Sequence, residues 1–190
     1  ESGAAAGHPL AGREVRSPAL RGVVFEQALA ARPASGWPAY LSDHRVAGSP
    51  VLPATAYLEM ALYAGRQALK APQVTVEGVT LERLLPLGPQ PRATQVIVEG
   101  ERVSIYSDDG RAWNLHATAS VRAVDRAEPP EKLDLSGIHT RCCVEVGVDD
   151  FYQNLRDHGL EYGPAFRGVR QLCHCAGEAL GRVELPSSVA

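Results

Sequence analysis

His44 is the residue in this sequence whose type and surroundings are best suited to moving a proton. It begins the pattern H-x-x-x-G-x-x-x-x-P, which continues with Gly48 and ends at Pro53. Glycine permits an unusual turn or a close backbone approach, and proline is tolerated in the first turn of a helix. We therefore expect His44 to lie beside the unpaired amides of a helix N-terminus. Such amides can stabilise charge on a thioester carbonyl while a neutral imidazole removes the α-proton.

A second group of candidate residues is the turn formed by Tyr162, Gly163 and Pro164. Gly-Pro after an aromatic residue fixes a turn, and the Tyr162 phenol could donate a hydrogen bond into a cleft. Both groups also have a structural interpretation. A single histidine is often held in a loop by its neighbours, and a Tyr-Gly-Pro turn is often only an anchor. The residues alone leave both interpretations open.

The elements that must position these residues follow from the spacing of apolar side chains. Residues 54–69 place apolar residues on one helical face, which predicts a largely buried helix directly after Pro53. A short helix at 149–158, capped by Asp149, is also predicted. Strands are expected at residues 22–29, 74–81, 94–99, 103–106, 113–124, 140–148, 168–175 and 179–185. A buried helix followed by a meander of strands indicates an α+β fold.

The segment 125–138 reads as a linker. Charge and proline rise from residue 125 to residue 137 while the apolar periodicity vanishes. We therefore predict three parts: an N-terminal unit at 1–124, the linker at 125–138 and a C-terminal unit at 139–190. The last part has no second helix comparable in length to the one at 54–69, so it looks incomplete.

The composition excludes several classes of protein. The chain has 190 residues, 45% hydrophobic and 22% charged, with 18 glycines and 14 prolines, as expected of a globular protein rich in turns. A net charge of -3 without a basic run gives no electrostatic case for nucleic acid or an anionic membrane. No apolar stretch approaches the roughly 20 residues of a membrane helix, and no signal peptide is recognisable, so we expect a cytoplasmic protein. The sequence does not begin with Met, which is expected of a piece of a longer protein.

The four cysteines come late in the chain, at Cys142, Cys143, Cys173 and Cys175. A C-x-C with a neighbouring pair is not a familiar zinc spacing, so we expect no metal site. These residues are interpreted as small apolar side chains on strands, kept reduced in the cytosol.

The order of the motifs resembles that of the dehydratase domains of modular polyketide synthases. The resemblance rests on HPLAG at 8–12, LSDH at 41–44, PATAYLEMAL at 53–62 and GLEYGPAF at 159–166, and it covers most of the chain. That family is built as a double hotdog, two hotdog units fused in one chain. The resemblance therefore implies an α+β hotdog fold whose second unit is incomplete here.

The resemblance also assigns roles to the candidate residues. It implies that His44 is the catalytic base and that the residues matching the motifs lie beside the substrate, namely Gly48, Pro53, Tyr162, Gly163 and Pro164. Leu160 departs from the tyrosine often found at its position, which should affect pocket shape more than chemistry. The family's acid, in a D-x-x-x-Q/H pattern on the second hotdog helix, has no match. The aspartic acids that come closest are all in the wrong context: Asp43, Asp149, Asp150 and Asp157. We therefore expect the acid beyond Ala190.

The implied reaction is loss of water from a β-hydroxyacyl chain, giving an α,β-unsaturated product. The chain would arrive as a thioester on the phosphopantetheine arm of an acyl carrier protein, with no metal or redox cofactor. Acyl carrier protein and neighbouring synthase domains are the implied partners, and a homodimer is the usual assembly. Three alternatives stay open: a double-bond isomerase or cyclising dehydratase using the same histidine, a non-catalytic docking piece of a megasynthase, and an acyl-chain binding module.

Overall fold

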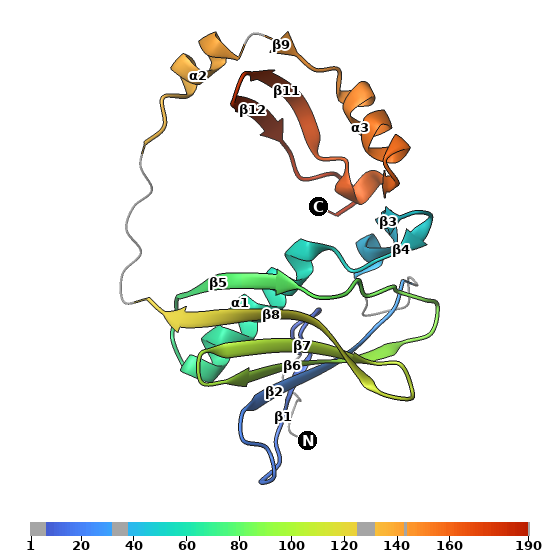
Figure 1. The fold of residues 1–190 in the computed structure, drawn as a ribbon, viewed down its shortest axis with the longest axis vertical. Helices are drawn as coiled ribbons and strands as arrows, with labels where there is room; N and C mark the ends of the chain where they lie inside the picture. The colour runs from blue at the N-terminus through green and yellow to red at the C-terminus, as the bar shows by residue number, and fades with distance from the viewer. Residues whose placement is uncertain (1–6, 32–37, 125–131, 143, 190) are drawn as a thin grey trace. The chain divides into compact units, whose positions relative to one another are not determined.

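The helix predicted at residues 54–69 is confirmed as α1, Ala54–Leu69, in a computed structural model of the chain. The structure describes residues 7–31, 38–124, 132–142 and 144–189, so the first half of the predicted linker, residues 125–131, lies outside them. The chain forms two units (Figure 1). The first comprises Glu1–Leu41 and Pro50–Ala127, and the second comprises Ser42–Ser49 and Glu128–Ala190. The segment that carries His44 therefore packs with the C-terminal residues. The predicted division into three consecutive parts stays a prediction.

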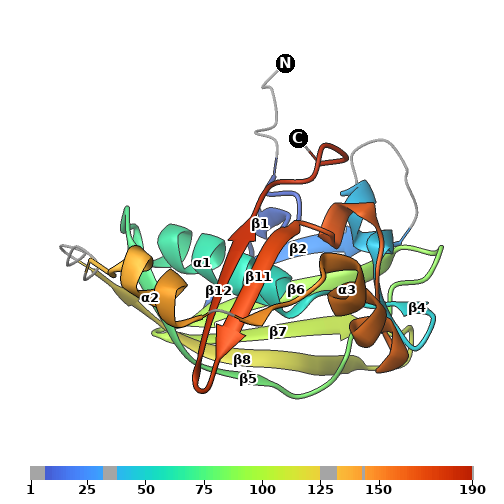
Figure 2. The ribbon, with the colours of Figure 1, turned by 90° about the horizontal axis from the view of Figure 1, so that it is seen from above.

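The first unit is an antiparallel sheet packed on α1. Its strands follow the order β1-β2-β6-β7-β8-β5, and Figures 1 and 2 show α1 lying against one face of them. Five of the predicted strands are confirmed here with small shifts at their ends. The bounds are Arg13–Val15 for β1, Val23–Leu29 for β2, Val74–Leu81 for β5, Arg92–Glu99 for β6, Arg102–Asp108 for β7 and Trp113–Ala123 for β8.

The core of the first unit lies between α1 and the sheet. Met60 of α1 is fully buried against strand residues that include Val96 and Ile105. Removing a side chain of this kind leaves a cavity and costs about 2–5 kcal/mol of unfolding free energy. Met60 is therefore part of the packing that holds α1 against the sheet.

The HPLAG segment ties the N-terminal residues to α1. The Nδ1 atom of His8 accepts hydrogen bonds from the amides of Leu10 and Ala11, at 3.3 and 3.1 Å. The proton is therefore on Nε2, which donates to Glu59 of α1 at 3.2 Å. The imidazole also stacks on Tyr63 of α1, with ring centroids 4.4 Å apart. This motif has a structural role within the first unit.

The second unit contains two small sheets and two helices. One sheet has the order β10-β3-β4 and the other β12-β11-β9. Tyr152 of α3 is buried, and its hydroxyl accepts a hydrogen bond from the Val169 amide at 2.9 Å. The bounds are His44–Val46 for β3, Ser49–Pro50 for β4, Leu135–Arg141 for α2, Val144–Glu145 for β9, Val148–Asp157 for α3, Leu160–Tyr162 for β10, Val169–Cys175 for β11 and Glu178–Val183 for β12.

Two sequence-based predictions in the second unit are wrong. The predicted strand at 140–148 contains only the two-residue strand β9, because its first residues end helix α2 and its last residue begins α3. The Asp134 carboxylate caps α2 by accepting from the Gly137 amide at 3.0 Å. The predicted capping role of Asp149 is also wrong. Helix α3 has Gly147 at its N-cap without a side-chain hydrogen bond, and Asp149 lies in the first turn. No helix among the described residues is long and apolar enough to span a membrane.

His116 is a buried polar residue of the first unit whose hydrogen bonds fix its protonation. It is 2% exposed, and its Nδ1 lies 3.0 Å from the Arg83 carbonyl, which can only accept. The Ser107 hydroxyl therefore donates to Nε2 at 2.8 Å. Burial lowers the pKa of His116, so the folded imidazole is neutral.

We expect the free energy of unfolding to fall as the pH is lowered from about 7 to 5. In this pH range the imidazole of the unfolded chain, with a pKa of about 6.5, becomes protonated, whereas the buried His116 of the folded protein stays neutral because its pKa is lower. The unfolded state therefore binds more protons, and acid favours unfolding. Replacing His116 with Gln should flatten this dependence in urea titrations followed by tryptophan fluorescence. The exposed His139, changed to Gln, is the matched control, and an unchanged slope in His116→Gln would contradict the assignment.

Candidate active site

The His44 segment is held by strand pairing within the second unit. The short 3-10 helix η1, Ala39–Asp43, ends directly before β3. Strand β3 pairs antiparallel with β10, so that His44 lies opposite Tyr162 and Arg45 opposite Glu161. The two motifs separated by more than a hundred residues in the sequence are therefore neighbours.

His44, Tyr162 and Phe166 form an aromatic group. The His44 ring centroid lies 5.4 Å from that of Tyr162 and 5.3 Å from that of Phe166, and the last two rings are 5.8 Å apart. All three side chains are half-buried. Rings at these distances restrict the rotation of the imidazole and keep part of its surface away from water.

Asp43 connects the Tyr-Gly-Pro turn to the backbone next to His44. Its carbonyl accepts a hydrogen bond from the Gly163 amide at 2.8 Å, and its carboxylate accepts one from the Ala165 amide at 2.9 Å. A Cβ atom on Gly163 would lie 2.5 Å from Asp43 Cγ, closer than van der Waals contact allows. Pro164 then begins the short helix η2, Pro164–Phe166, with Gly163 at its N-cap. Glycine at 163 is therefore required by the close approach of Asp43.

Gly48 forms the turn between β3 and β4. Ala47 and Gly48 have φ values of 49° and 78°, two consecutive positive angles of the kind found in a two-residue hairpin turn. The Gly48 amide donates to the Glu161 carboxylate at 2.8 Å, and no atom would lie within 4 Å of an added Cβ. Of the two possibilities predicted for this glycine, the unusual turn is confirmed and the close approach is not observed.

Pro53 immediately precedes α1 rather than lying within its first turn. It occupies the N-cap position with a φ of −68° and without a side-chain cap, and it is buried. Pro53 and the N-terminal amides of α1 belong to the first unit, whereas His44 belongs to the second. The prediction that His44 and these amides act on one substrate stays a prediction.

The aspartic acids of the second unit have local partners. Asp149 pairs with Arg167 at 3.3 Å, and Asp157 accepts a hydrogen bond from Gln153 one turn earlier in α3 at 2.7 Å. His158 Nδ1 donates to the Asn154 carbonyl at 2.7 Å, so Asp157 and His158 end a helix, as their context predicts. Exposed contacts of this kind contribute little to stability.

Two residues beside His44 were not predicted as part of the site. Phe166 ends the GLEYGPAF motif, four residues after Tyr162, and this position in the motif is the sequence feature that could have indicated its contact with His44. The sequence suggests Asp43 only as a candidate acid, whereas its carboxylate anchors the Tyr-Gly-Pro turn. An open hollow of about 390 Å³ lies along this region, and its lining includes Arg45, Arg156 and Tyr162 but not His44.

The cysteines follow the predicted strands only in part. Cys173 and Cys175 lie on β11, as expected, but Cys142 ends helix α2 instead of lying on a strand. Cys143 is outside the described residues. A hollow of about 560 Å³ is lined by Cys142 and Cys173 together with residues of β11 and β12, and it contains none of the predicted site residues.

The chain belongs to the polyketide synthase dehydratase family. The family model described as the polyketide synthase dehydratase domain matches residues 8–118, and the one described as the polyketide synthase dehydratase N-terminal domain matches residues 130–190. Mycoketide-CoA synthase of Mycobacterium tuberculosis is 36% identical over 193 residues, which are 97% of this chain and 4% of that protein. The chain thus spans a small part of the curated relatives it matches.

Solved dehydratase structures have the same fold. The dehydratase domain from the CurK module of curacin polyketide synthase matches with a TM-score of 0.88 and 30% identity, over 96% of this chain and 67% of that one. The dehydratase domain of PpsC from Mycobacterium tuberculosis, in complex with C12:1-CoA, matches with a TM-score of 0.79 and 31% identity, over 96% and 65% of the two chains. The expected hotdog fold is confirmed, and its double form is supported by these structures.

Replacing Gly163 with Ala should destabilise the second unit by about 1–3 kcal/mol, because the added Cβ overlaps Asp43 and forces the turn away from β3. Chemical denaturation followed by circular dichroism measures the change. Gly181→Ala is the matched control in the same unit, because the nearest atoms to its Cβ lie at 3.5 Å and beyond. Equal stability of the two variants would contradict the proposed close approach.

Proposed function

We propose that this chain carries the base of a dehydratase active site, acting on a β-hydroxyacyl thioester borne by an acyl carrier protein. The observation that carries the proposal is the His44, Tyr162 and Phe166 group, fixed by strand pairing and by the hydrogen bonds of Asp43. A general base must be held in a fixed orientation and partly shielded from water, and this group meets both requirements.

In the proposed reaction the His44 imidazole removes the α-proton of the thioester. The electron pair of that C–H bond forms the α,β double bond as the β-hydroxyl leaves. Hydroxide is a poor leaving group, so an acid must protonate it and release water. We expect this acid to be an aspartic acid outside the present chain. The Tyr162 phenol is placed beside the base and could donate a hydrogen bond to the thioester carbonyl or to the departing hydroxyl.

Two solved relatives support this division of labour. Inactive mutants of the CurK dehydratase have been solved with a histidine replaced by phenylalanine and with an aspartic acid replaced by asparagine. Each of these changes removes a group able to transfer a proton. In this chain His44 is the histidine that matches the motif, which is why we assign the base to it.

The proposal includes the form in which the substrate arrives. The PpsC dehydratase was solved with an acyl-CoA, whose chain is attached to the same phosphopantetheine arm that an acyl carrier protein bears. We propose acyl carrier protein and neighbouring synthase domains as partners, with a homodimer as the assembly. The elimination exchanges only a proton and a hydroxyl, so it requires neither a metal nor a redox cofactor. Gly48, Pro53, Gly163 and Pro164 shape the loops around the substrate.

Replacing His44 with Ala should lower kcat/KM for dehydration of a 3-hydroxyacyl thioester by about 10²–10⁴-fold, because no other group takes the α-proton. The measurement is made by mass spectrometry in the complete dehydratase domain of which this chain is part. His158→Ala, an exposed histidine at the end of α3, is the control and should keep wild-type activity. Full activity of His44→Ala would refute the proposal, and isomerised or cyclised products would identify the related enzyme activities.

Replacing Tyr162 with Phe should preserve the aromatic group and remove only the hydroxyl. If that hydroxyl donates to the reacting thioester, we expect kcat to fall by about 10- to 150-fold, equivalent to the loss of one hydrogen bond to a charged group. Steady-state kinetics on the same thioester measure the change. Phe166→Leu is the control that measures the effect of changed ring packing on kcat. An unchanged kcat in Tyr162→Phe would limit Tyr162 to a structural role.

A further inference from the structure

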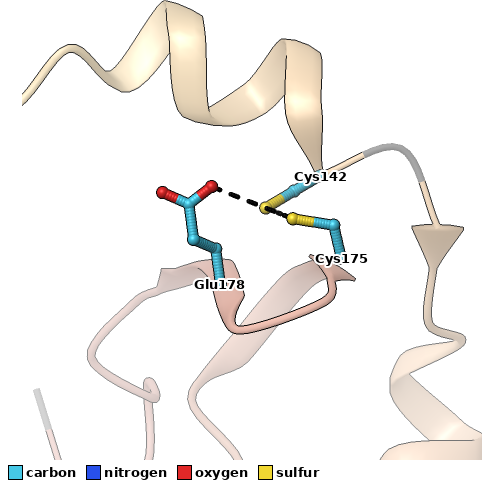
Figure 3. Close-up of side chains that lie close together, drawn as sticks. All are labelled: Cys142, Cys175 and Glu178. Atoms are coloured by element: carbon cyan, nitrogen blue, oxygen red, sulfur yellow. Dashed lines mark hydrogen bonds between the residues drawn. The ribbon is translucent and has the colours of Figure 1, made fainter.

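Cys142, Cys175 and Glu178 bring their ligand atoms together at one place in the second unit. Two thiol sulfurs and a carboxylate oxygen all lie within 4.8 Å of one another (Figure 3). The residues come from the end of α2 and from the hairpin formed by β11 and β12, and none of them contacts the His44 group in the hydrogen bonds or ring contacts described above. The cluster is therefore separate from the proposed catalytic residues.

Two of the three distances between the ligand atoms are close to those expected on one face of a tetrahedral metal site, and the third is within 4.8 Å. With Zn–S bonds of about 2.3 Å and Zn–O bonds of about 2.1 Å, tetrahedral angles place two sulfurs about 3.8 Å apart and a sulfur and an oxygen about 3.6 Å apart. The observed separations are 3.5 Å for the sulfurs of Cys142 and Cys175 and 3.8 Å for Cys175 Sγ and the Glu178 carboxylate. A covalent disulfide would need the sulfurs at about 2.05 Å, so Cys142 and Cys175 are free thiols in this structure and are available as ligands.

The backbone holds the three ligands in place. Cys175 and Glu178 are cross-strand partners that flank a two-residue turn, and Gly177 in that turn has a φ of 82° that favours glycine. Cys142 is fixed at the other side by its amide, which donates to the Ile138 carbonyl of α2 at 2.8 Å. Little rearrangement is needed to close the ligands around an ion.

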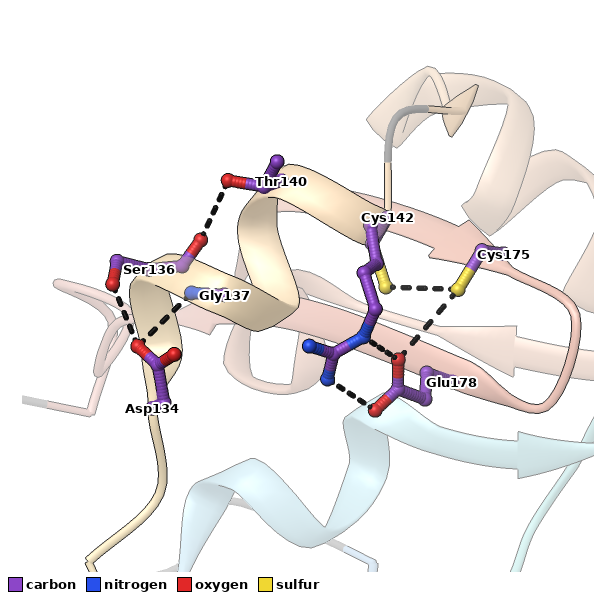
Figure 4. A network of polar contacts seen from close by, with 8 residues as sticks. Asp134, Ser136, Gly137, Thr140, Cys142, Cys175 and Glu178 are labelled. Atoms are coloured by element: carbon purple, nitrogen blue, oxygen red, sulfur yellow. Dashed lines mark hydrogen bonds and ion pairs between the residues drawn. The ribbon is translucent and has the colours of Figure 1, made fainter.

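Arg141 orients the carboxylate. Its guanidinium donates to both oxygens of Glu178, at 2.8 and 2.7 Å. Figure 4 shows Glu178 and Cys175 among the polar contacts beside α2. The carboxylate keeps lone pairs that these two hydrogen bonds do not use, so it can still act as a ligand. Groups that orient a ligand in this way raise metal affinity.

We propose that Cys142, Cys175 and Glu178 bind a thiophilic divalent cation, with Zn²⁺ the best match and a water molecule as the fourth ligand. Thiolate ligands select zinc over the hard cations that prefer oxygen. Binding forms two metal–sulfur bonds and releases two thiol protons to solvent. The ion and its three protein ligands then carry a net charge of −1, which the Arg141 guanidinium balances.

The sequence spacing did not predict this site, because its two cysteines are 33 residues apart and neither belongs with Glu178 in a known zinc motif. A bound ion would link the end of α2 to the tip of the hairpin. Binding must displace the thiol protons, so the affinity for the ion should increase with pH.

The test is a titration of the reduced full-length chain with Zn²⁺, followed by calorimetry, and with Co²⁺, followed by visible absorption. We expect one ion per chain, with Co²⁺ bands typical of tetrahedral thiolate coordination. Cys142→Ser and Cys175→Ser should each weaken Zn²⁺ binding by more than about 100-fold, beyond the 10–100-fold typical of outer-shell partners. Glu178→Gln should weaken it without removing a thiol.

Cys173→Ser is the matched control, because Cys173 lies on the same strand and its thiol donates to the Leu180 carbonyl at 3.6 Å instead of joining the cluster. Its affinity should equal that of the wild type. The proposal would be overturned by an equal loss of Zn²⁺ affinity in Cys173→Ser or by absence of Zn²⁺ binding to the reduced wild type. Isolation of the protein only with a Cys142–Cys175 disulfide would also overturn it. If circular dichroism shows that the serine variants do not fold, the Co²⁺ spectrum of the wild type and the Zn²⁺ titration of Glu178→Gln test the proposal instead.

Discussion

The antiparallel pairing of β3 with β10 is the constraint on which the candidate active site depends. These strands contain only three residues each, and isolated pairs of that length are not stable in water. Their register is supported by side chains at both ends. At one end the Glu161 carboxylate accepts from the Gly48 amide, and at the other the Asp43 carboxylate accepts from the Ala165 amide, while the Asp43 carbonyl accepts from the Gly163 amide. Both carboxylates act as backbone partners, so the loops stay fixed without a continuous sheet.

Within the His44 and Tyr162 motifs, some residues determine the backbone conformation and others provide functional side chains. Gly48 and Gly163 allow the chain to turn and to approach closely, whereas His44 and Tyr162 are the residues proposed to act on the substrate. The positions that allow the turns and those proposed to carry the chemistry are a few residues apart, which explains why the motif is a sparse pattern. HPLAG is different, since its histidine is used entirely by hydrogen bonds and stacking within the first unit.

The sequence predicted α1 and the long strands because many apolar residues contribute to each period. The sequence-based predictions were wrong or incomplete where one or two residues determine the local structure. Helix α2, capped by Asp134, extends into the segment predicted as a strand, and the role of Asp43 depends on an amide 122 residues away. The Cys142 and Cys175 pair was missed for the same reason, since zinc spacings describe ligands that are close in sequence. Such contacts follow from the fold and have no local signature.

The membership of Ser42–Ser49 in the second unit has a consequence for recombining synthases. The chain leaves the first unit before His44 and re-enters it at Pro50, so no single cut divides the protein into its two units. A chimera joined anywhere between Pro50 and Tyr162 would take His44 from one parent and its ring partners from the other. The eight residues from Ser42 to Ser49 and the segment from Gly159 to Phe166 are therefore best exchanged as a pair.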